Sequence, residues 1–223
     1  MKKNKDAEEK LKEIEKAVYA IKFYPVVVDE QSKEDAMKKI ISLYNSGEDT
    51  VKQMVLYMVH ESLAKHAEFK VTHSYDYFKH KSPTHDPAQL RMNVYRAMFN
   101  YNNSLEGVID MIRMLGEFRG DDAAKLLTYH YSRACIHDSE LNNTLRAVII
   151  ETLGRSESKY ALKALLEYAR YCESDRTINR IVAALIEWEE RIDNMKIKAK
   201  EKEKLKKKLH EVITKEVGGT HYG

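Results

Sequence analysis

Two five-residue segments with the same pattern decide the fold: Tyr131-Ser132-Arg133-Ala134-Cys135 and Tyr168-Ala169-Arg170-Tyr171-Cys172. They lie 37 residues apart, each near the end of a predicted helix. A period of this length is typical of stacked helix pairs. Each pair has an apolar face that it buries only against its neighbours. The repeated pattern therefore predicts an α-helical repeat protein.

The composition favours an all-α chain. Of 223 residues, 43% are hydrophobic and 33% are charged, which is normal for one compact domain with a charged surface. The three prolines are Pro25, Pro83 and Pro87, so residues 88–217 contain none. Because proline interrupts helices, its absence there predicts uninterrupted helical structure.

The hydrophobic period also predicts helices in the first third of the chain. Apolar residues spaced as on one helix face predict a helix from about Lys5 to Lys22. Ser32, followed by Asp35, is the expected N-cap of a second helix that ends at Asn45-Ser46-Gly47. A third helix is expected after Thr50.

A longer motif resembles the second helix of a HEAT repeat. The segment Leu145-Arg146-Ala147-Val148-Ile149-Ile150-Glu151-Thr152-Leu153-Gly154 has an aliphatic residue, then Arg, then an apolar cluster and a closing Leu-Gly. Residues 50–59 and 178–187 are similar, although Asn179 stands where Arg is usual. The resemblance implies a right-handed, HEAT-like α-solenoid of stacked antiparallel helix pairs near residues 87–118, 121–154 and 157–190.

Three regions follow from these patterns. Residues 1–31 are an N-terminal helix and connection, 32–190 the HEAT-like domain, and 191–223 a lysine-rich helical extension with a disordered tail. Residues 196–217 hold nine lysines and four glutamates, so the rest of the chain has a net charge of −2. We expect a long, charged and solvated C-terminal helix. A docking or dimerising helix is one alternative, and nucleic-acid contact is another, through Lys204, Lys206, Lys207 and Lys208.

The candidate partner-binding residues are Asn143, Arg146, Arg176 and Asn179. The resemblance implies that the exposed face of each second helix lines the inner surface of the solenoid, where a partner peptide or helix binds. A regularly placed arginine in this architecture also bonds to a neighbouring repeat. We expect Trp188 to lie in the core, and the paired tyrosines to pack between repeats.

A histidine cluster supplies the enzyme alternative. If residues 69–80 are helical, His73, Asp76 and His80 share a face and could hold one divalent metal ion; the alternative is a polar surface helix. HEAT-like deoxyhypusine hydroxylases build a di-iron site from repeated His-Glu pairs, but this chain has only His60-Glu61 and, far along the sequence, His210-Glu211. HEAT-like DNA glycosylases need aromatic and acidic groups around a base. The single tryptophan of this chain, Trp188, is predicted to be a core residue, which disfavours this analogy.

The sequence thus favours a non-enzymatic interaction or scaffold protein that binds a partner protein on its helical surface. A nucleic-acid-binding protein and a metal-dependent enzyme are the alternatives, and no cofactor is predicted. No apolar run is long enough for a membrane span, and no signal peptide follows the N-terminus, so we expect a cytoplasmic protein without membrane contact. A homodimer is compatible with this prediction. Cys135 and Cys172 are expected to be small packing residues.

Overall fold

The computed structural model describes residues 2–22, 24, 28–68, 105–136, 140–172, 174–195 and 197–219. These residues contain nine α-helices and no strand, which confirms the predicted all-α class. The helices are α1 (Lys2–Lys22), α2 (Glu30–Ser46), α3 (Asp49–Glu68), α6 (Leu105–Leu115), α7 (Asp121–Ala134), α8 (Glu140–Arg155), α9 (Lys159–Tyr171), α10 (Asp175–Ile192) and α11 (Ala199–Gly219).

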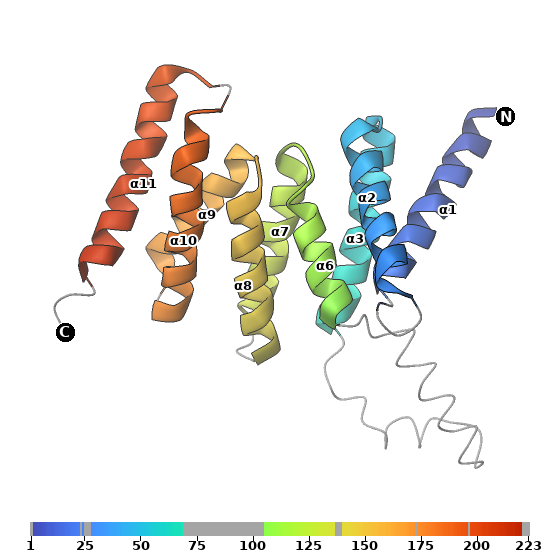
Figure 1. Ribbon diagram of the computed structural model, residues 1–223, viewed down its shortest axis with the longest axis horizontal. Coiled ribbons are helices and arrows are strands. Elements are labelled where there is room, and N and C mark those ends of the chain that lie inside the picture. Colours follow the sequence, from blue (N-terminus) through green and yellow to red (C-terminus); the bar gives the residue numbers. More distant parts are fainter. Residues whose placement is uncertain are drawn as a thin grey trace, which may run out of the picture. The chain divides into compact units, whose positions relative to one another are not determined.

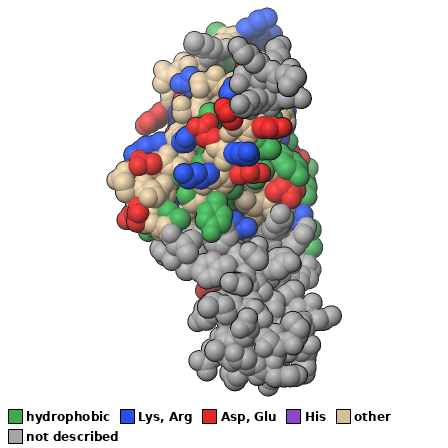
Figure 2. Space-filling model, turned by 90° about the vertical axis from the view of Figure 1, so that its right-hand side faces the viewer, with side chains coloured by type: hydrophobic (Ala, Val, Ile, Leu, Met, Phe, Trp, Pro, Cys, Tyr) green, Lys and Arg blue, Asp and Glu red, His purple; other side chains and the backbone are tan. Residues whose placement is uncertain are grey.

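The chain forms two compact units, Met1–Met111 and Ile112–Gly223, and α6 spans the boundary. In the first unit, α1, α2 and α3 all pack against one another (Figure 1). Their apolar stripes meet in a core that includes Ile14, Ile21, Ile40, Val55 and Val59. On the described part of the face in Figure 2, basic and acidic side chains are interspersed and hydrophobic ones lie among them.

The start of α2 differs from the prediction. The N-cap is Asp29, whose carboxylate accepts a hydrogen bond of 2.7 Å from the backbone N–H of Ser32. This bond lowers the pKa of Asp29. Ser32 was therefore wrongly predicted as the cap, because an acidic side chain three residues earlier already satisfies its N–H. The expected domain boundary at residue 32 falls inside the first turn of α2.

A buried cation joins α2 to the middle of α6 within the first unit. The Nζ of Lys33 lies 2.9 Å from Oδ2 of Asp110 and 4.0 Å from the ring centre of Tyr24. Burial opposes the charge of Lys33, but the hydrogen bond and charge of Asp110 outweigh it, so the pKa of Lys33 is raised. Lys33 is therefore a buried cation whose charge is compensated by a carboxylate.

The second unit places its helices in two layers. Helices α8, α10 and α11 lie side by side, with α7 and α9 behind them (Figure 1). Consecutive helices α7 and α8 pack together, as do α9 and α10, and these match the predicted pairs at 121–154 and 157–190. Helix α10 contacts α8, α9 and α11, so it is the centre of the unit.

Close approaches of α8 to its neighbours depend on small residues. Toward the turn after α6, a Cβ added to Gly116 would lie 2.9 Å from Cγ2 of Thr152. Toward α10, a Cβ added to Gly154 would lie 2.8 Å from the Cβ of Ala184. Next to this contact the Trp188 ring is fully buried, as expected, and its Nε1–H donates to the Leu153 carbonyl at 3.2 Å. The predicted Leu-Gly ending is therefore a helix-packing site.

The lysine-rich C-terminal segment is not a solvated extension. Helix α10 ends at Ile192, and α11 returns to pack on α10 and α9 with Leu205 and Leu209 buried. The reversal is held at Asp193, whose carboxylate binds Lys206 at 2.7 Å and whose carbonyl accepts from Lys202 at 2.6 Å. The prediction of a solvated helix was wrong because two leucines one turn apart make an apolar side, which is buried here against α9 and α10. The predicted disordered tail is helical up to Gly219, and residues 220–223 lie outside the described part.

Candidate interaction surfaces

The repeated pattern marks a contact between α7 and α9. The rings of Tyr131 and Tyr168 stack with centroids 4.1 Å apart and an interplanar angle of 20°. At the other end of the same helices, the Ser158 hydroxyl donates to the Asp121 carboxylate at 2.6 Å. Both contacts join residues 37 positions apart, so α7 and α9 run parallel in register.

The cysteines of the pattern do not share this packing role. Cys135 and Cys172 are free thiols at the C-terminal ends of α7 and α9. Cys135 is exposed and Cys172 is half-buried, so the packing interpretation was wrong for Cys135. The reason is position: a residue that caps a helix end extends beyond the interface that the preceding turn buries.

The stacked tyrosines predict a specific response to alkali. Burial raises the pKa of Tyr131 and Tyr168 well above the ordinary value of 10.0. A raised pKa in the folded state contributes stability that is complete below the unfolded value and is lost as pH rises above it. We expect Tyr131 and Tyr168 to ionise after the other tyrosines, and only as helicity is lost. Tyrosinate absorbance and circular dichroism, followed together during an alkaline titration, measure this. Y131F/Y168F should lack this delayed fraction; ionisation of every tyrosine before unfolding would contradict the prediction.

The structure divides the predicted partner-binding residues into two kinds. Asn143, Arg176 and Asn179 are exposed, whereas Arg146 is half-buried. Arg146 donates to the Asn143 side chain and, at 3.4 Å, to the carbonyl of Ala134 at the end of α7. Arg146 therefore serves helix packing, while Arg176 has no ion pair or hydrogen bond from its side chain within the described part of the chain.

These residues lie near one end of the α8–α10 layer. Arg180 on α10 forms an ion pair of 3.0 Å with Glu151 on α8, and Ala184 faces Gly154. Both contacts join residues about 30 positions apart, so the two helices run parallel. Arg176 is consequently level with Arg146. The Arg180–Glu151 pair confirms the expected bond from a regularly placed arginine to a neighbouring helix.

The sequence interpretation missed most of the exposed row on α10. The row contains Arg176, Asn179, Ala183, Ile186 and Glu190, all exposed and spaced by three or four residues. Ile186 is 51% exposed, whereas Ile181 and Trp188 on the opposite side of α10 are fully buried. Helices α8 and α11 flank α10, so the row is the middle of a three-helix surface. We call it the α10 row.

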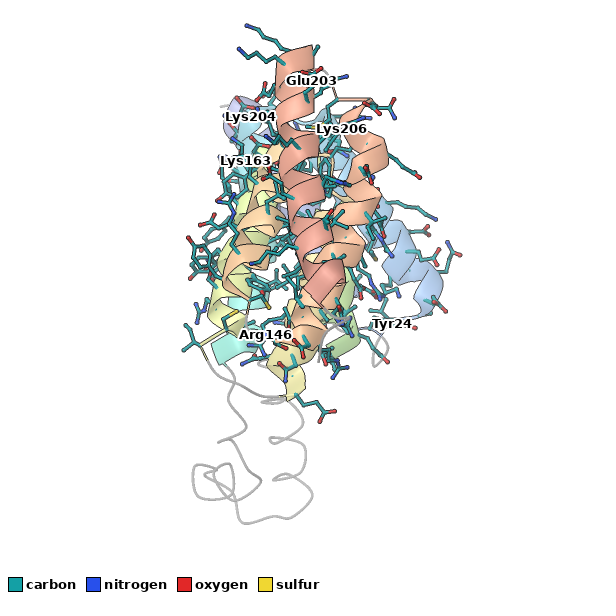
Figure 3. All side chains as sticks on the ribbon, turned by 90° about the vertical axis from the view of Figure 1, so that its left-hand side faces the viewer. Tyr24, Arg146, Lys163, Glu203, Lys204 and Lys206 are labelled. Carbon is teal, nitrogen blue, oxygen red and sulfur yellow. The ribbon has the colours of Figure 1, made fainter. Side chains whose placement is uncertain are left out.

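The four candidate lysines of α11 are not equivalent. Lys206 binds Asp193, and Lys207 lies 3.9 Å from Glu211. Lys204 and Lys208 have no side-chain partner within the described residues. Figure 3 shows Lys204 on the same side of the unit as Lys163 of α9, whereas Lys206 lies on the opposite, α10 side.

The outer side of α7 and α9 carries exposed aromatic rings. Tyr129 is 46% exposed, Tyr160 is 37% exposed and Tyr171 is 78% exposed. Arg133 donates to the Tyr129 hydroxyl at 3.2 Å, so Tyr129 is part of a local pair. The prediction that paired tyrosines pack between helices therefore holds for Tyr131 and Tyr168 but not for Tyr129 and Tyr171. Tyr129 lies two residues before Tyr131 and so faces a different side of α7. Tyr171 is the last residue of α9.

The candidate metal ligands His73, Asp76 and His80 lie outside the described residues. Among residues that the structure describes, no group of three or more His, Cys, Asp or Glu side chains is arranged to hold a metal ion. His60 and Glu61 are consecutive, half-buried residues of α3. The structure thus supplies no further geometry for the enzyme alternative.

Two further findings concern membrane spans and similarity to known proteins. Within the described residues, none of the helices combines the length and the apolar character needed to cross a membrane. Comparison with protein-family models, with curated proteins and with solved structures found no match. The exposed surfaces of the molecule are therefore the basis for assigning a function.

Proposed function

We propose that this protein is a non-enzymatic, HEAT-like interaction protein that binds a partner protein on the α8–α10 surface. The observation that carries the proposal is the α10 row, an exposed stripe along a helix whose opposite side is core. It presents a free guanidinium at Arg176 and an apolar side chain at Ile186. Arginine and large apolar anchors are what protein interfaces use most.

A repeat architecture is supported by matching burial in the two second helices. Leu145, Val148 and Ile149 of α8 are buried, and so are Ile178, Ile181 and Val182, each 33 residues later. The same offset connects the two HEAT-like motifs in the sequence. The match does not extend along the whole α10 row, because Ile150 and Leu153 of α8, the counterparts of Ala183 and Ile186, are fully buried.

The α10 row is held rigidly. Arg180 pairs with Glu151, and Arg191 donates to the Gly154 carbonyl at 2.6 Å. Both bonds anchor α10 to α8 on either side of Ile186. A surface that is already ordered loses little conformational entropy when a partner binds. The backbone of the row therefore favours recognition of a folded or helical partner segment.

The test compares two double variants that make the same kind of change. R176E/I186E alters the α10 row, and K38E/Y57E alters a lysine and a 61% exposed tyrosine in the first unit. The full chain is used to capture partners from lysate of the source cell, with and without nuclease. We expect a nuclease-resistant protein partner whose affinity for R176E/I186E is at least about tenfold weaker, the size of one interface anchor.

The control outcomes separate this surface from others. K38E/Y57E should retain the partner with unchanged affinity. Equal retention by R176E/I186E would show that the α10 row is not the binding surface, and recovery that nuclease abolishes would contradict a protein partner. Arg146 is left unchanged because its bond to Ala134 would make a loss of binding ambiguous.

A further inference from the structure

We propose that the outer edge formed by α9 and α11 binds single-stranded nucleic acid, independently of the α10 row. The edge is defined by Lys163 and Arg170 of α9 and Lys204 and Lys208 of α11. Two tyrosines of α9, Tyr160 and Tyr171, border it. It is called the α9–α11 edge below.

The orientation of α11 decides which lysines reach this edge. Leu205 and Leu209 point into the core, and Glu201 pairs with Lys159 of α9. Residues 204 and 208 follow Glu201 by three and seven positions, so they continue on the α9 side of the helix. Lys202 and Lys206 instead reach Asp193 on the α10 side.

Unpaired charge at the edge is predominantly positive. Glu201 and Glu211 are already engaged by Lys159 and Lys207. Lys163, Arg170, Lys204 and Lys208 are exposed and have no partner within the described residues. Among the side chains of α9 and α11 that the structure describes, the exposed acids without a partner are Glu167 and Glu203, so the free cations outnumber the free acids. Such a row attracts a chain of phosphates by releasing its counterions.

Exposed rings favour nucleic acid over an acidic protein segment. Tyr160 and Tyr171 lie on the exposed side of α9, at 37% and 78% exposure. Eleven residues of helix separate them by about 16 Å, which is enough for several bases between two stacking sites. Cations along a backbone path with aromatic rings beside it are the features that bind single strands without strong sequence preference. Carboxylates of a peptide would use the lysines but would gain nothing from ring faces.

The chain offers a matched pair of variants on one helix. K204Q/K208Q removes the two free lysines, whereas K206Q/K207Q removes the same charge from the two lysines that are paired. Binding of the full-length protein to fluorescent oligo(dT) and oligo(U) is measured by anisotropy over a range of salt concentrations. For K204Q/K208Q we expect the slope of log affinity against log salt to fall by about 1.4, because each lost single-strand phosphate contact contributes about 0.7.

The other outcomes decide the matter. K206Q/K207Q should bind within about twofold of the unchanged protein, and Y160A/Y171A should bind oligonucleotide at least about tenfold more weakly while keeping its salt slope. Inorganic polyphosphate, which has no bases, should be unaffected by the tyrosine changes. An equal loss of oligonucleotide affinity in both lysine variants would mean that only the net charge of α11 matters, and it would overturn the proposal. So would absence of oligonucleotide binding, or binding of polyglutamate as tight as that of oligonucleotide. Circular dichroism confirms that each variant is folded.

Discussion

Replacing Trp188 with alanine should lower the free energy of unfolding by about 3–5 kcal/mol, the usual cost of removing a large buried aromatic side chain. The ring is fully buried in α10, and its Nε1–H donates to the Leu153 carbonyl of α8 at 3.2 Å. Alanine leaves a cavity and an unsatisfied carbonyl at the same place. Urea unfolding followed by circular dichroism measures the loss without relying on the fluorescence of the single tryptophan.

Trp188→Phe serves as the partial control. Phenylalanine retains most of the ring volume but cannot donate a hydrogen bond to Leu153, so we expect a loss of about 1–3 kcal/mol. A W188A midpoint equal to that of the unchanged protein would mean that Trp188 is not the packing centre of α8 and α10. The alanine variant should also bind the α10-row partner more weakly, since this contact supports the row.

Gly154→Val should lower the free energy of unfolding by about 1–3 kcal/mol or more, because its side chain has no room. The first added carbon would lie 2.8 Å from the Cβ and 3.2 Å from the Cα of Ala184. The second atom belongs to the backbone of α10, so relief requires separating the two helices. Thermal and urea unfolding of the variant measure the effect.

A double-mutant cycle shows whether the Ala184 contact is the cause. Gly154→Ala should destabilise by less than valine, and Ala184→Gly should recover part of that loss when the two are combined, since adjacent sites couple. Ala183→Val, on the exposed side of the same turn, should change stability by less than about 0.5 kcal/mol. Additive effects at positions 154 and 184 would contradict the proposed close contact.

The sequence correctly identified the residues of the α7–α9 contact but not their function at each position. Tyr131 and Tyr168 repeat after 37 residues, and their rings do meet. The same repeat places Cys135 at an exposed helix end. A repeated pattern indicates that two residues occupy equivalent places, but burial depends on what the neighbouring helix covers. One sequence contains the first kind of information and only part of the second.

The candidate sites show the same division. Arg146 and Arg176 looked alike as arginines of second helices, but the Ala134 carbonyl accepts from only one of them. Ile186 was missed as an exposed anchor because apolar residues surround it in the sequence. Its exposure could have been inferred from its position, because it lies three residues after Ala183 and four before Glu190, on the same face of the helix. The proposed metal ligands at residues 73–80 lie outside the described residues and stay a prediction.

The sequence by itself determined the all-α class of the described residues and the limits of the two helix pairs near residues 121–154 and 157–190. Helix formation depends on local factors: proline-free segments, a 3.6-residue apolar period and turn residues at the ends. Only the tertiary structure decided which charges are free. The four lysines of α11 are neighbours in sequence, yet Lys206 is paired because the chain reverses at Asp193 and brings that carboxylate to one side of the helix. Ion pairs depend on distances of a few ångströms between separate segments, and those distances exist only once the leucines of α11 are buried.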